Sequence, residues 1–276
     1  MEIDFKEAQK LLAKYQIHCL KELSLNSVKG VDLLYQFPYK MPNLEKLKLT
    51  FSHDEFEARA NIPPQKGVGM VLQLKELVLF DLKMKDLGLG RIPFRQRLEL
   101  LSLVQCNQLK NLGSPSVSLT YLTCLELKIC WRLRNLMASS TAKSMVQLKT
   151  MKVIGCHQLE EIVSNEGSEE GKVMKIVFSK LITVELVRLE KMRSFCSYKE
   201  CEFEFPSLEI LIVRECPKMK KLRGSIAPKL KGVFGVEGDE KAKWHWEGDL
   251  NATIQKIFNE KVLTHLFIYV ILFLLV

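Results

Sequence analysis

The sequence predicts an α/β solenoid, a fold in which similar coils of chain stack along one axis. Residues 98–112 (LELLSLVQCNQLKNL) and 122–136 (LTCLELKICWRLRNL) both fit Leu-x-x-Leu-x-Leu-x-x-Cys-x-x-Leu-x-x-Leu. Weaker copies of this template recur along most of the chain, and a recurring template of this length is typical of a solenoid. The Leu-x-Leu alternation within each copy is typical of a short strand. We therefore predict a leucine-rich repeat horseshoe, with short parallel strands on its concave face and irregular loops or short helices on its convex face.

The template has a direct physical basis. Side chains alternate across a strand, so Leu101 and Leu103 point into one side while Ser102 points out. The Cys position follows where the chain turns away, and a small side chain that tolerates burial fits there. One coil cannot bury its own leucines, whereas a stack of coils can.

Eight to nine repeats follow one another between residues 18 and 236. Their first positions are Leu20, Leu44, Leu74, Leu98, Leu122, Leu148, Leu181, Leu208 and, in a weak ninth copy, Leu230. Two polar segments, 53–69 and 164–172, interrupt the pattern and carry the glycine, proline and charged residues of surface loops. We assign 18–236 to the repeat domain.

The chain ends are less regular. Residues 1–17 are predicted to form a helix or an irregular first coil, and residues 237–261 a C-terminal capping segment with a helix after Asp249. The tail, 262–276, includes 11 consecutive apolar residues at 266–276, whereas a membrane span needs about 20. It is a capping segment, a tail anchor or translated intron, and we do not expect a span. The abrupt start suggests that the chain is part of a longer protein.

The cysteines point to reduced thiols in the cytoplasm. Cys106, Cys130, Cys156 and Cys216 occupy one position of the repeat, so we expect them to form a buried ladder and not disulfides. The N-terminal residues MEIDFKEAQK lack the basic and apolar regions of a secretory signal. Cys196 and Cys201 could form a bridge or half of a zinc site, but no second pair at zinc spacing follows.

Catalytic patterns are missing from the sequence, so we expect neither an enzyme nor a cofactor. The nearest relative of a phosphate loop, 167–172, has the wrong spacing and two acidic residues. His157 beside Cys156 is better explained as an exposed neighbour of a ladder cysteine than as a metal ligand. The net charge is +9, and the basic run 216–224 is either a solvated edge or an anion-binding surface. It lacks the interleaved aromatic residues of a nucleic-acid site.

A protein-binding surface is the remaining expectation. Residues that alternate with the buried leucines should lie side by side along the concave face, and they combine apolar and charged side chains as protein-binding patches do. The predicted surface comprises Lys48, Glu76, Val78, Phe80, Leu100, Ser102, Val104, Glu126, Lys128, Lys152, Ile154, Glu185, Val187, Arg188, Ile210, Ile212 and Arg214.

Phrases such as FPSLEILIVRECPKMKKL (205–222) and LKTMKVIGCHQLEEIV (148–163) resemble the leucine-rich repeats of plant disease-resistance proteins of the coiled-coil, nucleotide-binding type. The resemblance covers about residues 18–258 and implies a recognition module of innate immunity. Its partner would be a pathogen effector, a guarded host protein or the receptor's own nucleotide-binding domain. This chain lacks that domain and the coiled coil. A substrate adaptor for ubiquitin ligation is the alternative, although residues 1–17 are short for an F-box.

Overall fold

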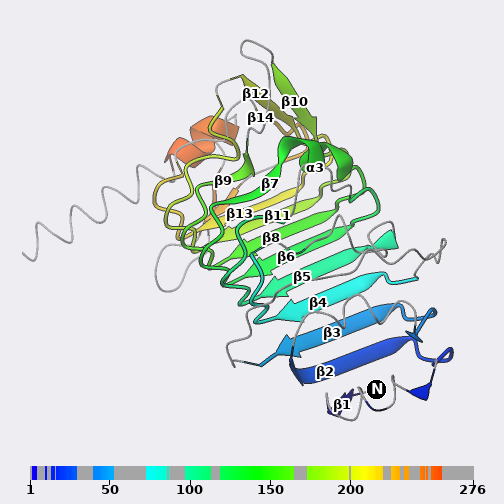
Figure 1. The fold of residues 1–276 in the computed structure, drawn as a ribbon. Helices are drawn as coiled ribbons and strands as arrows, with labels where there is room; N and C mark the ends of the chain where they lie inside the picture. The colour runs from blue at the N-terminus through cyan, green and yellow to red at the C-terminus, as the bar shows by residue number, and fades with distance from the viewer. Residues whose placement is uncertain are drawn as a thin grey trace, which may run out of the picture.

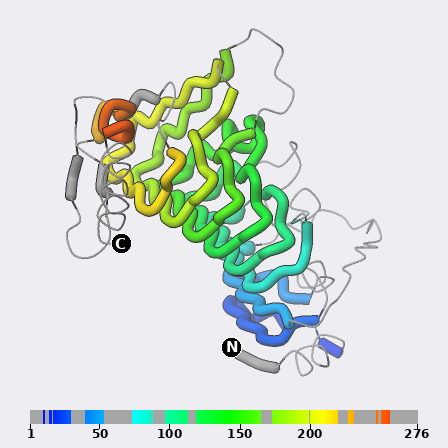
Figure 2. The backbone as a smooth tube through the Cα atoms, turned by 90° about the vertical axis from the view of Figure 1, so that its left-hand side faces the viewer, coloured from blue at the N-terminus to red at the C-terminus, as the bar shows by residue number. Residues whose placement is uncertain are grey.

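The computed structural model shows a solenoid whose coils stack from the N-terminal to the C-terminal end (Figures 1 and 2). It describes residues 2–4, 10, 14–15, 17–29, 40–52, 73–85, 87, 97–112, 119–164, 173–198, 200–219, 225–230, 233–235, 243–245, 247 and 250–256. The predicted loop at 53–69, most of the loop at 164–172 and the tail at 262–276 lie outside these residues. No helix among the described residues is long and apolar enough to cross a membrane.

One 11-stranded sheet runs the length of the described solenoid. Its strands are parallel, except that the last pairs antiparallel with its neighbour. In spatial order they are β1 (Glu2–Asp4), β2 (Glu22–Val28), β3 (Lys46–Phe51), β4 (Glu76–Phe80), β5 (Leu100–Val104), β6 (Cys124–Lys128), β8 (Thr150–Ile154), β11 (Thr183–Val187), β13 (Ile210–Arg214), β15 (Val233–Gly235) and β16 (Lys243–His245). The predicted parallel solenoid is confirmed.

Corresponding template positions pair across the sheet. Leu101 of β5 lies opposite Leu125 of β6, and Leu125 lies opposite Met151 of β8. All three side chains are fully buried. Because the side-chain period of a strand is two, a slip of one residue would expose every such row to water. The repeat itself therefore fixes the register.

Five strands of the central solenoid are each followed by a residue in the left-handed backbone region. Asp81, Gln105, Ile129, Gly155 and Arg188 have φ between 55° and 67° and occupy the same template position. Each donates its backbone N–H to the carbonyl that ends the next strand, as Gln105 does to Lys128 over 2.8 Å. The turn therefore bonds every coil to its successor. Only one of the five is the glycine that this conformation favours.

The cysteine ladder is confirmed. The Cys106 and Cys130 thiols are fully buried and hydrogen-bonded to one another, and Cys130 is also bonded to Cys156. The Cys106 and Cys130 thiols also reach the preceding coil, where Cys106 Sγ lies 3.7 Å from the Leu79 carbonyl oxygen and Cys130 Sγ lies 3.8 Å from that of Leu103. Cys216, also buried, donates to Leu186 O over 3.5 Å. A stack of small buried side chains thus fills the space under the turns.

The far side of the solenoid carries more regular structure than its sequence suggested. One short helix, α3 (Ser139–Ser144), packs against two further parallel sheets. The two-stranded sheet pairs β7 (Asn135–Ala138) with β9 (Glu161–Ser164); the three-stranded sheet has the order β10 (Met174–Val177), β12 (Cys201–Glu204) and β14 (Ser225–Ile226). The alternation in CEFEF, 201–205, is the signal that could have predicted β12.

An aromatic cluster fills the core beneath the three-stranded sheet. Phe178, Phe195, Phe203 and Phe205 are almost completely buried. The Phe178 and Phe205 rings stack with centroids 5.8 Å apart, and Phe195 meets Phe203 edge-on at 5.6 Å. Such pairs add about 0.5–1.5 kcal/mol each beyond the apolar area they bury. The cluster thickens the core where the repeats are longest.

The two ends of the solenoid are covered differently. At the N-terminal end β1 pairs with β2, so residues 2–4 extend the sheet by one strand. Near the C-terminal end residues 250–256 are helical, and Leu250 and Ile254 of this helix are buried in the main core. The predicted cap residue Asp249 lies outside the described residues.

Replacing one inward leucine tests the stacked core. Leu125→Ala removes a fully buried side chain packed between two coils, so we expect the free energy of unfolding to fall by about 2–5 kcal/mol. Equilibrium urea denaturation followed by circular dichroism measures the loss. The exposed control Lys149→Ala should change it by less than about 0.5 kcal/mol. An equal effect of both substitutions would contradict the core described above.

The turn conformation can be tested at Gly155. A Cβ at this position would lie 3.5 Å from Ile129 Cγ1, which is an ordinary van der Waals contact. The free-energy cost of a substitution is therefore set by the backbone conformation, whose φ is +67°. We expect Gly155→Ala to lower the free energy of unfolding by about 1 kcal/mol and Gly155→Asn by less, because Asn tolerates this region. Urea denaturation of both variants checks the order, and a more stable Ala variant would show that the turn is not strained.

Candidate protein-binding surface

The outward side chains of the main sheet form three rows that run across the strands. One row contains Ser24, Lys48, Val78, Ser102, Glu126, Lys152, Glu185 and Ile212 in successive strands. The row nearer the start of the strands contains Glu76, Leu100 and Ile210. The row nearer the end of the strands contains Phe80, Val104, Lys128, Ile154 and Arg214. The parallel register therefore brings the residues of the predicted surface together as expected.

Three of the predicted surface residues need correction. Ser102 is only 6% exposed because its short side chain lies in the row between Val78 and Glu126. Val187 is only 9% exposed because Ile154 and Arg214 flank it in the same way. Arg188 lies one residue beyond β11, in the left-handed turn, so its side chain borders the sheet and does not lie on it. The other predicted residues remain partly exposed.

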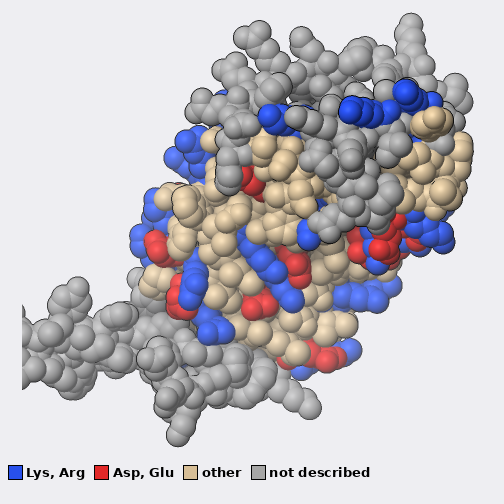
Figure 3. All heavy atoms as spheres, turned by 90° about the horizontal axis from the view of Figure 1, so that it is seen from below, with Lys and Arg blue, Asp and Glu red and all other residues tan. Residues whose placement is uncertain are grey.

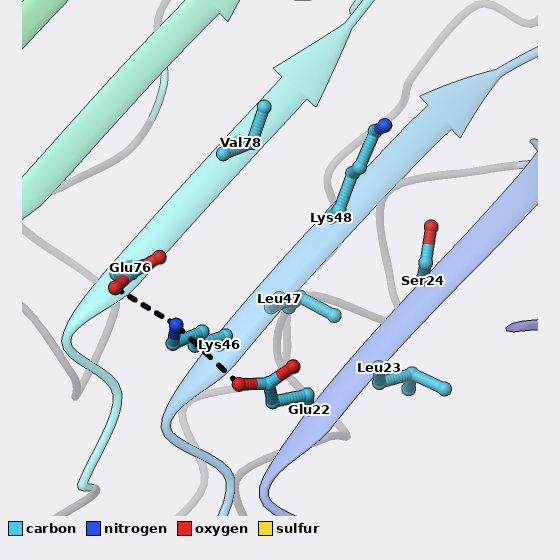
Figure 4. A pocket seen from close by; sticks show the side chains of 8 residues that line it. All are labelled: Glu22, Leu23, Ser24, Lys46, Leu47, Lys48, Glu76 and Val78. Atoms are coloured by element: carbon cyan, nitrogen blue, oxygen red, sulfur yellow. Dashed lines mark ion pairs between the residues drawn. The ribbon is translucent and has the colours of Figure 1, made fainter. Parts of the chain in front are cut away.

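The N-terminal part of the surface contains a depression of about 310 Å³ over β2, β3 and β4 (Figure 4). Lys46 lies between two carboxylates, with Nζ 3.4 Å from Glu22 and 3.3 Å from Glu76. The hydrogen bond to Glu76, followed by that to Glu22, raises the pKa of Lys46 above its ordinary value. Charge is therefore balanced within this depression, which contains no described catalytic arrangement.

An apolar patch lies next to the depression. Val78 and Phe80 of β4 pair with Ser102 and Val104 of β5, and all but the serine are partly exposed. The ammonium group of Lys48 lies 5.1 Å from the Phe80 ring centroid. This cation–π contact orders one border of the patch.

The other border of the patch is charged. Glu126 Oε2 lies 3.5 Å from Lys128 Nζ, and Glu126 Oε1 lies 3.6 Å from Lys152 Nζ. Ser102 also donates to Glu126 over 3.5 Å. One carboxylate thus faces two ammonium groups, which leaves an excess positive charge beside the apolar patch. Elsewhere Lys and Arg side chains lie next to Asp and Glu side chains on the described surface seen from below (Figure 3).

Chemical alternatives find no support among the described residues. They contain no group of three His, Cys, Asp or Glu side chains that could hold a metal ion. Cys196 and Cys201 lie close enough for their thiols to hydrogen-bond, but both are free. His157 Nδ1 lies 3.1 Å from Glu190 Oε1, away from the concave rows.

Comparison with known families agrees with the geometry. Residues 97–232 match the family model described as plant disease resistance protein RPS2-like, leucine-rich repeats. Residues 97–232 are therefore similar to the leucine-rich repeats of that plant disease-resistance family. The repeat region of such proteins is a recognition module that mediates protein–protein interaction. The match begins just before β5, so β2 to β4, with the depression, extend the solenoid beyond it.

The Cys106 and Cys130 thiols should be chemically inert. The hydrogen bond from Cys130 and burial raise the pKa of the Cys106 thiol well above its usual range. The hydrogen bond from Cys106 lowers the pKa of the Cys130 thiol. The hydrogen bond from Cys156 and burial act in the opposite direction and outweigh this effect, so the pKa of Cys130 is raised to about 12. Because the thiolate is the nucleophile, we expect N-ethylmaleimide to modify exposed Cys19 first at pH 7. Mass spectrometry locates the adducts, and modification of Cys106 or Cys130 before unfolding would contradict this ladder.

Proposed function

We propose that this chain recognises a protein in plant innate immunity through the concave face of its repeats. The partner would be a pathogen effector, a guarded host protein or a nucleotide-binding domain of the same receptor. The proposed place of action is the cytoplasm, in keeping with the eight free cysteines. No enzymatic step is assigned to the repeats.

The observation that supports this proposal is the apolar patch of β4 and β5 beside the lysine pair of β6 and β8. Protein interfaces combine an apolar centre with a polar rim. Here Val78, Phe80 and Val104 would form the centre, while Lys128 and Lys152 would form one side of the rim. A matching partner would place an apolar anchor next to carboxylates. Arg214, further along the same row as Lys128, would extend this contact.

Charge reversal on the concave face tests the proposal. Lys128→Glu, Lys152→Glu and Arg214→Glu together should abolish capture of the partner because they replace attraction by repulsion. The variant and the unchanged chain are each fused to a biotin ligase and expressed in leaf tissue. The proteins labelled by the two fusions are then compared. The result expected is a set of proteins lost from this variant alone.

The control variant combines Lys149→Glu, Lys180→Glu and Lys229→Glu. These side chains are exposed at positions just before or at the start of their repeats, away from the concave rows. The total charge change is the same, so its labelling should equal that of the unchanged chain. Arg214 is partly buried, so its replacement could disturb the fold. The double variant Lys128→Glu and Lys152→Glu leaves Arg214 in place and tests the surface without that risk. Identical labelling by all variants would refute a concave binding surface.

A further inference from the structure

The two flanks of the solenoid differ in charge. On the flank where the strands begin, the residue after the first leucine alternates in sign in the first four repeats, as Lys21, Glu45, Lys75 and Glu99. Glu45 Oε1 lies 3.4 Å from Lys21 Nζ, and Glu45 Oε2 lies 3.0 Å from Lys75 Nζ. The hydrogen bond from Lys75 lowers the pKa of Glu45. In the first four repeats, the charges of that flank therefore neutralise one another.

The flank where the strands end is basic. Figure 2 views this flank, with the successive turns stacked one above another. Six described cations lie in the turn just beyond the cysteine position of repeats four to eight: Lys110, Arg132, Arg134, Lys191, Arg193 and Lys218. The same turn positions also hold two carboxylates, Glu160 and Glu190. We call these six cations the basic row.

None of the basic row forms an ion pair with a carboxylate of the described residues. Two members are held instead by neutral amides of the preceding coil. Arg132 Nη1 donates to Gln108 Oε1 over 2.8 Å, and Lys191 Nζ donates to Gln158 Oε1 over 2.6 Å. An amide fixes the direction of a cation without cancelling its charge, so Arg132 and Lys191 remain available to an anion.

Two apolar side chains lie next to the basic row, one on either side of Cys130. Trp131 is 52% exposed and directly precedes Arg132, and Ile129 is 37% exposed. The Trp131 backbone N–H donates to Asn107 Oδ1 over 3.2 Å, which fixes the turn that carries the indole. Ile129 adopts the left-handed conformation with φ of 59°, which is unfavourable for a β-branched side chain. Repeat five thus places two exposed apolar side chains beside Arg132 and Arg134.

We propose that the strand-end flank binds the surface of an anionic lipid bilayer. Clusters of four to eight Lys and Arg attract the headgroups of anionic lipids. Tryptophan is the side chain that best anchors a protein at the boundary between headgroups and hydrocarbon. The row lies along one side of the arc, so its members can meet a flat surface together while the concave face stays free. The receptor surface would thus be held at a membrane without a spanning helix.

Other anionic partners fit this flank less well. A protein partner of fixed register would be met by cations and carboxylates in balance, as on the opposite flank, and not by a threefold excess of cations. A single-stranded nucleic acid needs several aromatic platforms, and among the described residues of the basic row's turns only Trp131 supplies one. Six cations against two carboxylates, with one indole, match a lipid surface, which is anionic and has an apolar layer below its headgroups.

Co-sedimentation with vesicles tests the proposal on the full chain. Binding is compared between phosphatidylcholine vesicles with and without phosphatidylserine. Insertion of the apolar tail does not need anionic lipid, so only attraction between the cations and the lipid charge should differ between the two vesicles. We expect binding to the phosphatidylserine vesicles to be stronger and to weaken as salt screens the row. Equal binding to both vesicles would overturn the proposal.

Charge reversal identifies the surface. Lys110→Glu, Arg134→Glu and Arg193→Glu should lower the partition coefficient on phosphatidylserine vesicles by at least about tenfold, since each cation contributes separately to attraction. The control variant Lys149→Glu, Lys180→Glu and Lys229→Glu, with the same net charge, should retain most of the binding. An equal loss in the control would refute a localised site.

Trp131→Ala separates the indole from the charges. It should weaken binding to phosphatidylserine vesicles severalfold while leaving the salt dependence unchanged, because no cation is removed. Circular dichroism and thermal unfolding confirm that each variant folds. If the unchanged chain ignores both vesicles but is retained on immobilised polyglutamate, the row recognises an acidic protein segment and the bilayer proposal is wrong.

Discussion

The burial of inward side chains between neighbouring coils is the constraint on which the structure depends. Leu125 is fully buried only because β5 precedes it and β8 follows it in the same sheet. Stability in such a chain is approximately a sum of terms for each coil and its two interfaces. The outward rows inherit their alignment from the inward rows, since one register sets both. The concave surface is therefore a product of the core.

The turns add a second, directional link between coils. At the end of each central strand, a left-handed residue donates to the carbonyl that ends the next strand. Asp, Gln, Gly and Arg occupy this position with little or moderate cost, whereas Ile129 does not. The ladder of thiols lies directly beneath these bonds, and their burial accounts for the small size of the side chain at that position.

Structural features that recur in every repeat could be predicted from the sequence, whereas features that occur in only one place could not. Leu101, Leu125 and Met151 could be aligned by their template positions, so the sheet, the core and the rows of the surface followed from it. The burial of Ser102 and Val187 could not be predicted, because it depends on the sizes of particular neighbours. The same holds for the link from Glu126 to Lys128 and Lys152, which requires rotamers as well as register. The sheet of β10, β12 and β14 lies in the segments between templates, where sequence periodicity is weak.

The equal length of repeats three and four, 24 residues each, has a consequence for how such a surface can change. Leu98 and Leu122 stand at equivalent places, and the coil between them joins its neighbours through the same pairing on either side. Duplication of this one coil would repeat the same register while moving Val78 and Phe80 away from the lysine pair by one strand spacing, about 4.8 Å. Unequal recombination between coils that share this template could thus reset the distance between two contact points in a single event. A lineage would then acquire a new arrangement of old side chains without passing through an unfolded intermediate.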